Sequence, residues 1–379
     1  MKELFIGLMS GTSLDGVDGV LVDFSKGLEV LAHQSASFPQ PFKTDLLSLN
    51  LPGDNELHRA SLCANELAHI YAKVCLALLN QTGLGPLDIS AVGAHGQTVR
   101  HRPGAFDGTG YTIQLNNPAL LAELSGIQVC ADFRARDVAA GGQGAPLVPA
   151  FHKNLFQDKN STVCILNLGG ISNLSVVPSA IESAREVIGF DCGPANCLMD
   201  EWCFKHTGQS YDDKGSWAAQ GTVIKPLLSL LMQASYFEAP APKSTGRDLF
   251  NMNWLEEHLN KLSNQNSELS DIRAVDIQAT LAMLTVQSCV NDIKRYANTA
   301  SRLIVCGGGA LNEYVMNLFN EALPNMAVSS TSEYGLPPLQ VEAAAFAWLA
   351  RRCIRGETAS LQSVTGAQGA RILGCIYQV

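Results

Sequence analysis

Apolar and polar positions along the chain follow two patterns, one typical of strands and one typical of helices. Short apolar runs suited to buried strands cover residues 4–9, 17–24, 89–94, 163–166, 171–177, 187–190 and 302–306. Longer stretches with apolar residues at helical spacing cover about residues 55–81, 274–296 and 341–352. Asp54 is expected to cap the first of these helices, and Gly83 to end it. Strands that alternate with helices predict an α/β fold.

A strand, a glycine-rich turn and a second strand occur together twice. The first copy surrounds Ser10–Gly16, and the second surrounds Asn167–Gly170, about 155 residues further along. Two copies of one unit predict two related lobes. Residues 134–146 break the periodicity with three glycines and two arginines, which favours a boundary at or just before them. The expected lobes are residues 1–130, to which residues 340–379 return, and residues 131–339.

Composition narrows the range of partners. The formal net charge of −9, with no basic face, argues against nucleic acid but not against one bound nucleotide. The apolar run at the N-terminus is too short for a signal peptide, and no run is long enough to span a membrane. The 11 cysteines are scattered without a Cys-x-x-Cys pair, which is typical of buried thiols in a reducing compartment. We therefore expect a cytoplasmic protein without a membrane partner.

Three glycine-rich turns, at residues 11–16, 169–170 and 307–309, each follow a buried strand. Ligands of open α/β sheets bind beyond the carboxyl ends of strands, so these positions suit the phosphates of a nucleotide. The first turn is not a Walker A loop, because Val17 stands where that motif has lysine. The third lacks the last glycine of a dinucleotide fingerprint. Each turn alone is equally compatible with a simple corner, but together they favour a nucleotide site.

Several carboxylates are candidates for chemistry. Asp191 follows a strand and precedes Gly193-Pro194, where it can accept a proton or hold a metal-bound water; a helix cap or Asx turn is the alternative. Asp15 and Asp18 flank the first turn, and either could reach Mg²⁺ through water or stabilise the turn. Glu342 stands on an alanine-rich helix that we expect to be buried, so it needs a partner, functional or structural.

Other polar side chains suit a sugar. His95, Gln97 and Thr98 follow one short strand, and Arg134 follows Asp132-Phe133. Their amide, hydroxyl and guanidinium groups fit a sugar that carries hydroxyls, an amide and a carboxylate. Arg134 or Arg136 could pair with that carboxylate through two hydrogen bonds. Polar residues of surface loops would give the same pattern.

Together these motifs resemble the anhydro-N-acetylmuramic acid kinases. Met9–Asp18 is similar to the opening signature of that family. Six further segments are similar to it in the same order: Ala94–Thr98, Asp132–Arg134, Asn167–Asn173, Asp191–Asn196, Gly246–Asp248 and Cys306–Gly309. The match covers essentially the whole chain. Cys192 stands where threonine or a similar small residue is expected.

The resemblance implies two lobes of mixed sheet flanked by helices, as in the actin, hexokinase and 70-kDa heat-shock ATPase fold, with ATP and Mg²⁺ as cofactors. In that fold the two glycine hairpins grip the phosphates from opposite lobes, and the triple-glycine turn receives the adenosine. The nucleotide residues are then Gly11, Thr12, Ser13, Leu14, Asp15, Gly16, Val17, Asp18, Gly169, Gly170, Gly307, Gly308, Gly309 and Asn312, with Asp15 toward the metal. The substrate residues are His95, Gln97, Thr98, Arg134, Asn196 and Glu342.

The resemblance also implies a reaction in peptidoglycan recycling. ATP, water and 1,6-anhydro-N-acetylmuramic acid give ADP and N-acetylmuramic acid 6-phosphate, and Asp191 activates the water. Similar proteins are dimers, so we expect a homodimer. The alternatives are another carbohydrate kinase of the same fold, which would not consume water, and a non-catalytic nucleotide-dependent binding protein.

Overall fold

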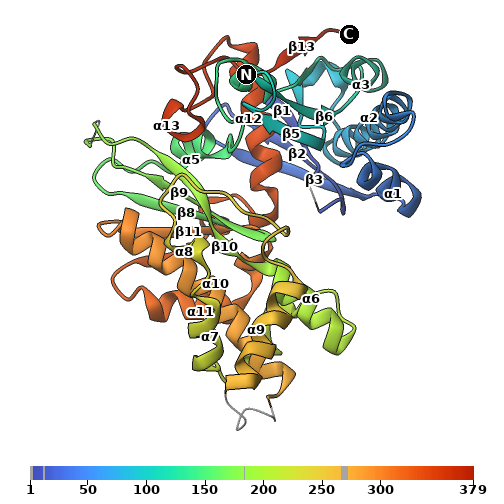
Figure 1. Ribbon diagram of the computed structural model, residues 1–379. Helices are drawn as coiled ribbons and strands as arrows, with labels where there is room; N and C mark the ends of the chain where they lie inside the picture. The colour runs from blue at the N-terminus through green and yellow to red at the C-terminus, as the bar shows by residue number, and fades with distance from the viewer. Residues whose placement is uncertain (1–2, 12, 183, 266–271) are drawn as a thin grey trace. The chain divides into compact units, whose positions relative to one another are not determined.

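The computed structural model describes residues 3–11, 13–182, 184–265 and 272–379 and divides the chain into two compact units (Figure 1). The first unit comprises Met1–Leu155 and Gln340–Val379, and the second comprises Phe156–Leu339. The first therefore extends beyond the predicted boundary near residue 130. The reason is packing: Phe151 lies against Trp348 of the returning segment, with ring centroids 5.9 Å apart.

The first unit contains a six-stranded mixed sheet with the order β13-β7-β4-β1-β2-β3. Its strands are β1 (Leu4–Met9), β2 (Gly16–Asp23), β3 (Glu29–Ser37), β4 (Ala91–Ala94), β7 (Val129–Ala131) and β13 (Cys375–Tyr377). Strand β2 is antiparallel to β1 and β3, whereas β4 is parallel to β1 and β7. A separate hairpin pairs β5 (Gln97–Pro103) with β6 (Gly110–Leu115).

The second unit repeats this topology in a five-stranded sheet with the order β10-β9-β8-β11-β12. Its strands are β8 (Val163–Leu168), β9 (Ile171–Val177), β10 (Ile188–Pro194), β11 (Arg302–Cys306) and β12 (Ala327–Ser330). Strand β9 is antiparallel to β8 and β10, and β11 is parallel to β8 and β12, as in the first sheet. The predicted fold class, two related α/β lobes of mixed sheet flanked by helices, is therefore confirmed.

Helices cover both sheets. Those of the first unit are α1 (Gln40–Ser48), α2 (Glu56–Thr82), α3 (Pro118–Ser125), α4 (Ala135–Ala139), α5 (Val148–Phe156), α12 (Val341–Ile354) and α13 (Gln362–Thr365). Those of the second are α6 (Asn196–Thr207), α7 (Lys225–Leu231), α8 (Ser235–Glu238), α9 (Met252–Gln265), α10 (Ala274–Tyr296) and α11 (Glu313–Ala322).

Helix α12 packs directly on the first sheet because small residues face one another. A Cβ atom at Gly7 of β1 would lie 1.9 Å from the carbonyl oxygen of Ala343, and one at Gly93 of β4 would lie 2.1 Å from that of Phe346. Glycines in the strands and alanines in the helix thus bring the two backbones together. The segment returning from residue 340 is held to the first unit by this contact.

Helix α2 is, among the described residues, the one helix long and apolar enough to cross a membrane. Half of its most apolar window is buried inside the protein, and its stripe of Leu67, Tyr71 and Leu78 is fully buried. This burial is typical of a core helix of a globular domain.

Candidate functional site

The first glycine turn joins β1 to β2. Its two end glycines differ in what they require: a Cβ at Gly16 would lie 2.2 Å from the carbonyl oxygen of Ala36, whereas one at Gly11 would meet only Ser13 Oγ, at 3.7 Å. Gly11 does not have a positive φ, so a residue with a side chain could adopt the same backbone conformation without strain. Leu14 has a left-handed φ of 58° and donates its N–H to the Gly11 carbonyl. The turn needs glycine at position 16 for folding but not at position 11.

The other predicted residues of this turn divide between core and surface. Leu14 and Val17 are buried in the core, so they can reach a nucleotide only through their main chain. Ser13 and Asp15 are exposed. Asp18 lies 3.2 Å from His33 Nε2 of the neighbouring strand, which already provides it with a partner. Thr12 lies outside the described residues.

A prediction follows from the difference between the two glycines. Gly11→Ala should fold with near-normal thermal stability and raise the KM for ATP, because a methyl group would stand where phosphate oxygens approach the main chain. Gly16→Ala, the matched control, should lower the melting temperature. Thermal unfolding together with ATP titration distinguishes the two effects. Normal ATP affinity in Gly11→Ala would remove the first turn from the nucleotide site.

Buried His95 and part-buried Arg134 form a polar pair in the first unit. The His95 ring donates Nδ1–H to the Ser10 carbonyl at 3.2 Å, and its Nε2 accepts from Arg134 Nε at 3.1 Å and Nη2 at 3.0 Å. Arg134 Nη1 also donates to the Gly144 carbonyl at 2.9 Å. Burial, and then the Arg134 charge, lower the pKa of His95 to about 3, so the ring is neutral.

The hairpin beside this pair holds polar atoms without a partner among the described residues. They are Gln97 Oε1, Gln114 Oε1 and both amide atoms of Asn116. Gln114 faces Thr98 across the hairpin and donates to its hydroxyl at 3.3 Å. Buried amides rarely remain unpaired, so these groups suit a polar ligand. The sequence analysis missed Gln114 and Asn116. Gln114 lies in β6 and Asn116 directly follows it, and residues two positions apart along a strand point to the same face.

The side chain of Glu342 is more exposed than expected. Helix α12 is buried as predicted, but the Glu342 side chain in its first turn is exposed. Desolvation by the surrounding protein raises the pKa of this carboxyl, and the nearby Arg134 charge opposes the shift. A carboxylate in the first turn of a helix is also favoured by the helix dipole. The role of Glu342, functional or structural, therefore stays a prediction, although its side chain reaches solvent.

Asp191 lies on β10, and both of its carboxylate oxygens are held. Asn173 of β9 donates to Oδ1 at 2.9 Å, and the main-chain N–H of Thr245 donates to Oδ2 at 3.0 Å. The ladder of β10 and β9 shifts register between Asp191 and Gly193, a bulge that is common beside functional sites. Burial raises the pKa of Asp191, while these two hydrogen bonds oppose the rise. Neither a helix cap nor an Asx turn describes this arrangement.

The turn at Gly169-Gly170 contacts the start of α6. The Gly169 carbonyl accepts from the N–H of Asn196, and the Gly170 carbonyl accepts from Ala195 and Cys197. Arg247 Nη2 would lie 3.8 Å from a Cβ atom at Gly170, so the predicted Gly246–Asp248 motif is close to this turn. The second turn is thus built from main chain, with an arginine beside it.

The triple-glycine turn lies at a cavity of about 350 Å³ within the second unit. The cavity is lined by Asn196, Met199, Asp200, Tyr211, Asp212, Asp213, Lys214, Gly308, Leu311, Asn312 and Leu339. Cβ atoms at Gly307 and Gly309 would collide with Asn167 Oδ1 and with the Leu168 Cβ, at 2.3 and 2.5 Å. Gly308, in contrast, opens onto the cavity. The turn folds tightly and leaves room for a ligand of small-molecule size.

Two predicted residues meet in this cavity. Asn312 caps α11, accepting the N–H of Val315 at 3.0 Å, and Asn196 donates its side-chain amide to the Leu168 carbonyl at 2.9 Å. Asn196, expected at the sugar, thus lies beside Gly308. The loop at Tyr211–Lys214 was not predicted, because nothing in its polar sequence separates it from an ordinary surface loop.

No group of three or more histidine, cysteine or acidic side chains that could hold a metal occurs within the described ranges.

The family model described as anhydro-N-acetylmuramic acid kinase matches residues 3–379. Two proteins of that name, from Albidiferax ferrireducens and Variovorax paradoxus, are each 55% identical to the chain. The first alignment covers 100% of both chains, and the second 99% of both.

Solved structures align over most of the chain at low identity. Component A of the (R)-2-hydroxyglutaryl-CoA dehydratase of Acidaminococcus fermentans has a TM-score of 0.47 and 11% identity, and covers 91% of this chain and 98% of its own. A ROK family glucokinase from Streptomyces griseus has a TM-score of 0.42 and 12% identity, with 92% and 99% covered.

Proposed function

The chain belongs to the anhydro-N-acetylmuramic acid kinase family, and we propose that it converts 1,6-anhydro-N-acetylmuramic acid, ATP and water into N-acetylmuramic acid 6-phosphate and ADP. The observation that carries the mechanism is Asp191, a part-buried carboxylate with both oxygens oriented and its pKa raised. Such a group is suited to accept a proton. The reaction belongs to the recycling of peptidoglycan.

In the proposed reaction Asp191 takes a proton from a water molecule as the water oxygen bonds to C1 of the sugar. The bond between C1 and O6 breaks, and O6 bonds to the γ-phosphorus of ATP. The bond from that phosphorus to the leaving oxygen of ADP breaks as the γ-phosphoryl group is transferred. Water therefore supplies the new hydroxyl at C1, and ATP supplies the whole phosphoryl group. The raised pKa of Asp191 strengthens it as a base once it is deprotonated.

The His95–Arg134 pair of the first unit is proposed to bind the sugar. Arg134 stays charged, since burial lowers its pKa only to about 10. Its guanidinium can pair with the lactyl carboxylate, and neutral His95 fixes its orientation. The unpaired amide oxygens of Gln97 and Gln114 supply acceptors for hydroxyl and acetamido groups, and the unpaired amide of Asn116 supplies both a donor and an acceptor.

ATP is proposed to place its adenosine in the cavity at Gly308 and its phosphates against the main chain of the glycine turns. The exposed Asp15 fits Mg²⁺, which commonly takes one or two carboxylates together with phosphates and waters. When bound there, Mg²⁺ would neutralise charge on the phosphates.

The cellular setting is also a proposal. All eleven cysteines are free thiols and ten of them are buried, which suits the reducing cytoplasm. The expected homodimer can be tested by sedimentation of the purified protein.

Release of ADP with a panel of sugars tests the function most broadly. We expect turnover with the 1,6-anhydro sugar and little with glucose, N-acetylglucosamine or N-acetylmuramic acid. Mass spectrometry of the product should show the gain of both a phosphoryl group and a water. Preferred turnover of an ordinary sugar, with no water gained, would indicate the rival carbohydrate kinase. Nucleotide binding without turnover of any sugar would indicate a binding protein.

A further inference from the structure

The carboxylate of Asp191 depends on a loop that follows α8. The main-chain N–H of Asp191 donates to the Lys243 carbonyl at 3.0 Å, and the Thr245 N–H donates to the Asp191 carboxylate. Residues 243–245 have no helical or strand structure of their own. The position of this loop is therefore fixed by contacts of its side chains and of the residues next to it in the sequence.

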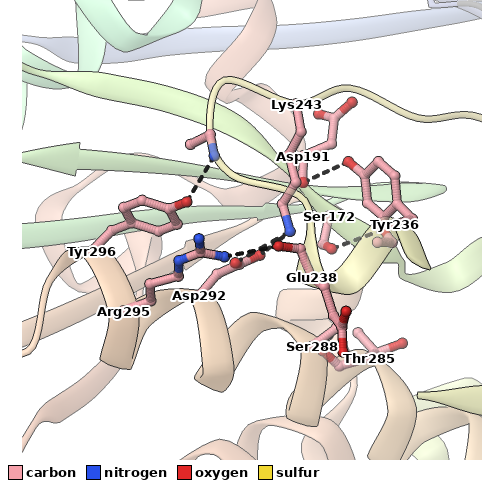
Figure 2. Close-up of polar contacts among 12 residues, drawn as sticks. Ser172, Asp191, Tyr236, Glu238, Lys243, Thr285, Ser288, Asp292, Arg295 and Tyr296 are labelled. Atoms are coloured by element: carbon pink, nitrogen blue, oxygen red, sulfur yellow. Dashed lines mark hydrogen bonds and ion pairs between the residues drawn. The ribbon is translucent and has the colours of Figure 1, made fainter. Parts of the chain in front are cut away.

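A buried ion pair supplies one of these contacts (Figure 2). Lys243 Nζ lies 3.2 and 3.1 Å from the two carboxylate oxygens of Asp292 on α10, and each side chain is 4% exposed. The ammonium also lies 5.1 Å from the ring centroid of Tyr236 and 5.9 Å from that of Phe190. The loop is thus fastened to a core helix by its lysine.

Further hydrogen bonds hold the segment that precedes Lys243. The Ala241 N–H donates to the Tyr296 hydroxyl at 2.7 Å, and Arg295 donates to the Glu238 carbonyl at 3.2 Å, both from α10 (Figure 2). The Tyr236 hydroxyl donates to the Asp191 carbonyl at 2.7 Å. Helix α10, the loop and β10 therefore form one connected set of polar contacts behind Asp191.

A buried ion pair is a poor device for stability alone. Removing two charges from water offsets most of their attraction, and apolar residues of similar size often stabilise a protein equally well. An ion pair instead specifies one geometry, because both charges are satisfied only when they meet. That property suits a loop that must hold a hydrogen-bond donor against a carboxylate.

We propose that the Lys243–Asp292 ion pair positions Asp191, by fixing the loop whose Thr245 N–H holds the carboxylate. The proposal rests on the proposed role of Asp191 as the base. Lys243 and Asp292 do not themselves touch the reacting atoms. Without the pair, the loop moves, Asp191 turns from its productive orientation, and the Thr245 hydrogen bond is lost.

Loss of that hydrogen bond should shift the pKa of Asp191 in a direction that can be measured. The Thr245 N–H stabilises the charged carboxylate, so without it the pKa of Asp191 rises further. A base works when deprotonated, and activity falls as the pH falls through its pKa. The acid limb of the activity profile should therefore move to higher pH. A purely structural ion pair would lower stability without moving this limb.

Other titratable groups face β10 at this point: Lys243 of the loop, Tyr236 of α8, Cys289, Asp292 and Tyr296 of α10, and Cys192 of β10 itself. Burial raises the pKa of Tyr236 and of Cys192, which keeps both neutral on the acid side. Burial also raises the pKa of Asp292, against the opposing effect of Lys243. Asp292 could therefore contribute to an acid limb, and the test must remove it.

The double variant Lys243→Met/Asp292→Leu removes both charges and keeps the volume apolar. With both substrates saturating, kcat should fall ~10–10²-fold through misplacement of the base. The acid limb of kcat should move up by roughly 0.5–1 pH unit, and the KM for ATP should stay within about twofold. The control is Lys205→Met/Glu256→Gln, which removes an exposed ion pair of the same unit and should change none of these quantities.

Lys243→Gln/Asp292→Asn provides a second, milder variant, because it removes both charges but keeps polar groups at both positions; the same shift is expected at smaller size. An acid limb and kcat at wild-type values in a folded double variant would overturn the proposal. If neither variant folds, the ion pair serves stability and the proposal is likewise overturned. Asp191→Asn separates this outcome from failure of the proposed function. If Asp191→Asn is inactive while the double variant keeps its profile, only the positioning role fails; an active Asp191→Asn contradicts the base itself.

Discussion

Asp191→Asn is expected to lower kcat by ~10²–10⁴, the usual loss when a general base is removed. This corresponds to about 3–5 kcal/mol of activation free energy. Asparagine has nearly the same shape but cannot take the proton from water. It can accept only one of the two hydrogen bonds that Asn173 and Thr245 donate, so a small loss of stability should accompany the loss of rate. Single-turnover kinetics with saturating substrates measures the effect on chemistry.

The fold and the affinity for ATP should remain near normal in this variant, because Asp191 does not line the cavity at Gly308. Asp276→Asn is a suitable control, since Asp276 pairs with Arg273 in the first turn of α10. Near-normal turnover of Asp191→Asn would make Asp191 a structural residue of the bulge, and Glu342 would be the next carboxylate to test.

The second large effect is expected at Arg134. Arg134→Lys should lower kcat/KM for the anhydromuramic sugar ~10–10²-fold, because a charged hydrogen bond typically contributes about 1.5–3 kcal/mol and lysine lacks the planar fork. Parallel assays with 1,6-anhydro-N-acetylglucosamine, which has no lactyl carboxylate, isolate the contribution of that group. The variant should lose most of the preference for the muramic sugar.

Disruption of His95 would affect both sugars alike, so the ratio of the two kcat/KM values is the decisive quantity. Arg136→Lys is the matched control: Arg136 is exposed on α4 and was the other candidate for the carboxylate. An unchanged ratio in Arg134→Lys would show that another group binds the carboxylate. A changed ratio in Arg136→Lys would transfer the role to that residue.

Strong local patterns made much of the fold predictable. The continuous apolar strands and the repeated turns predicted the two related lobes. Gly83 ends α2 with a φ of 68°, as expected. Asp54 does not cap that helix; Asn55 occupies the cap, without a side-chain hydrogen bond. Strand β3 and the β5–β6 hairpin were not predicted. Polar residues interrupt the alternation that identifies a strand in β3 and β5, whereas β6 does alternate and was missed.

The candidate site was predictable where its residues fall within motifs, and less so where distant segments meet. Asp191 belongs to a motif, but Thr245, which holds its carboxylate, lies 54 positions away. The Lys243–Asp292 pair spans 49 positions, and neither residue has a local signal. The spacing of Gln114 and Asn116 indicates a shared face, but their unpaired buried polar atoms were visible only in the structure. Side-chain partners of this kind depend on tertiary packing, which local patterns do not encode.

Attack of water at C1 is the central claim, and one turnover in ¹⁸O-labelled water tests it most directly. We expect the label in the hydroxyl at C1 of the N-acetylmuramic acid 6-phosphate and none in the transferred phosphoryl group. Fragment masses at the first turnover, corrected for exchange at the anomeric carbon by unlabelled product placed in the same water, locate the oxygen. Product with an unlabelled C1, or with the label in its phosphate, would contradict the account.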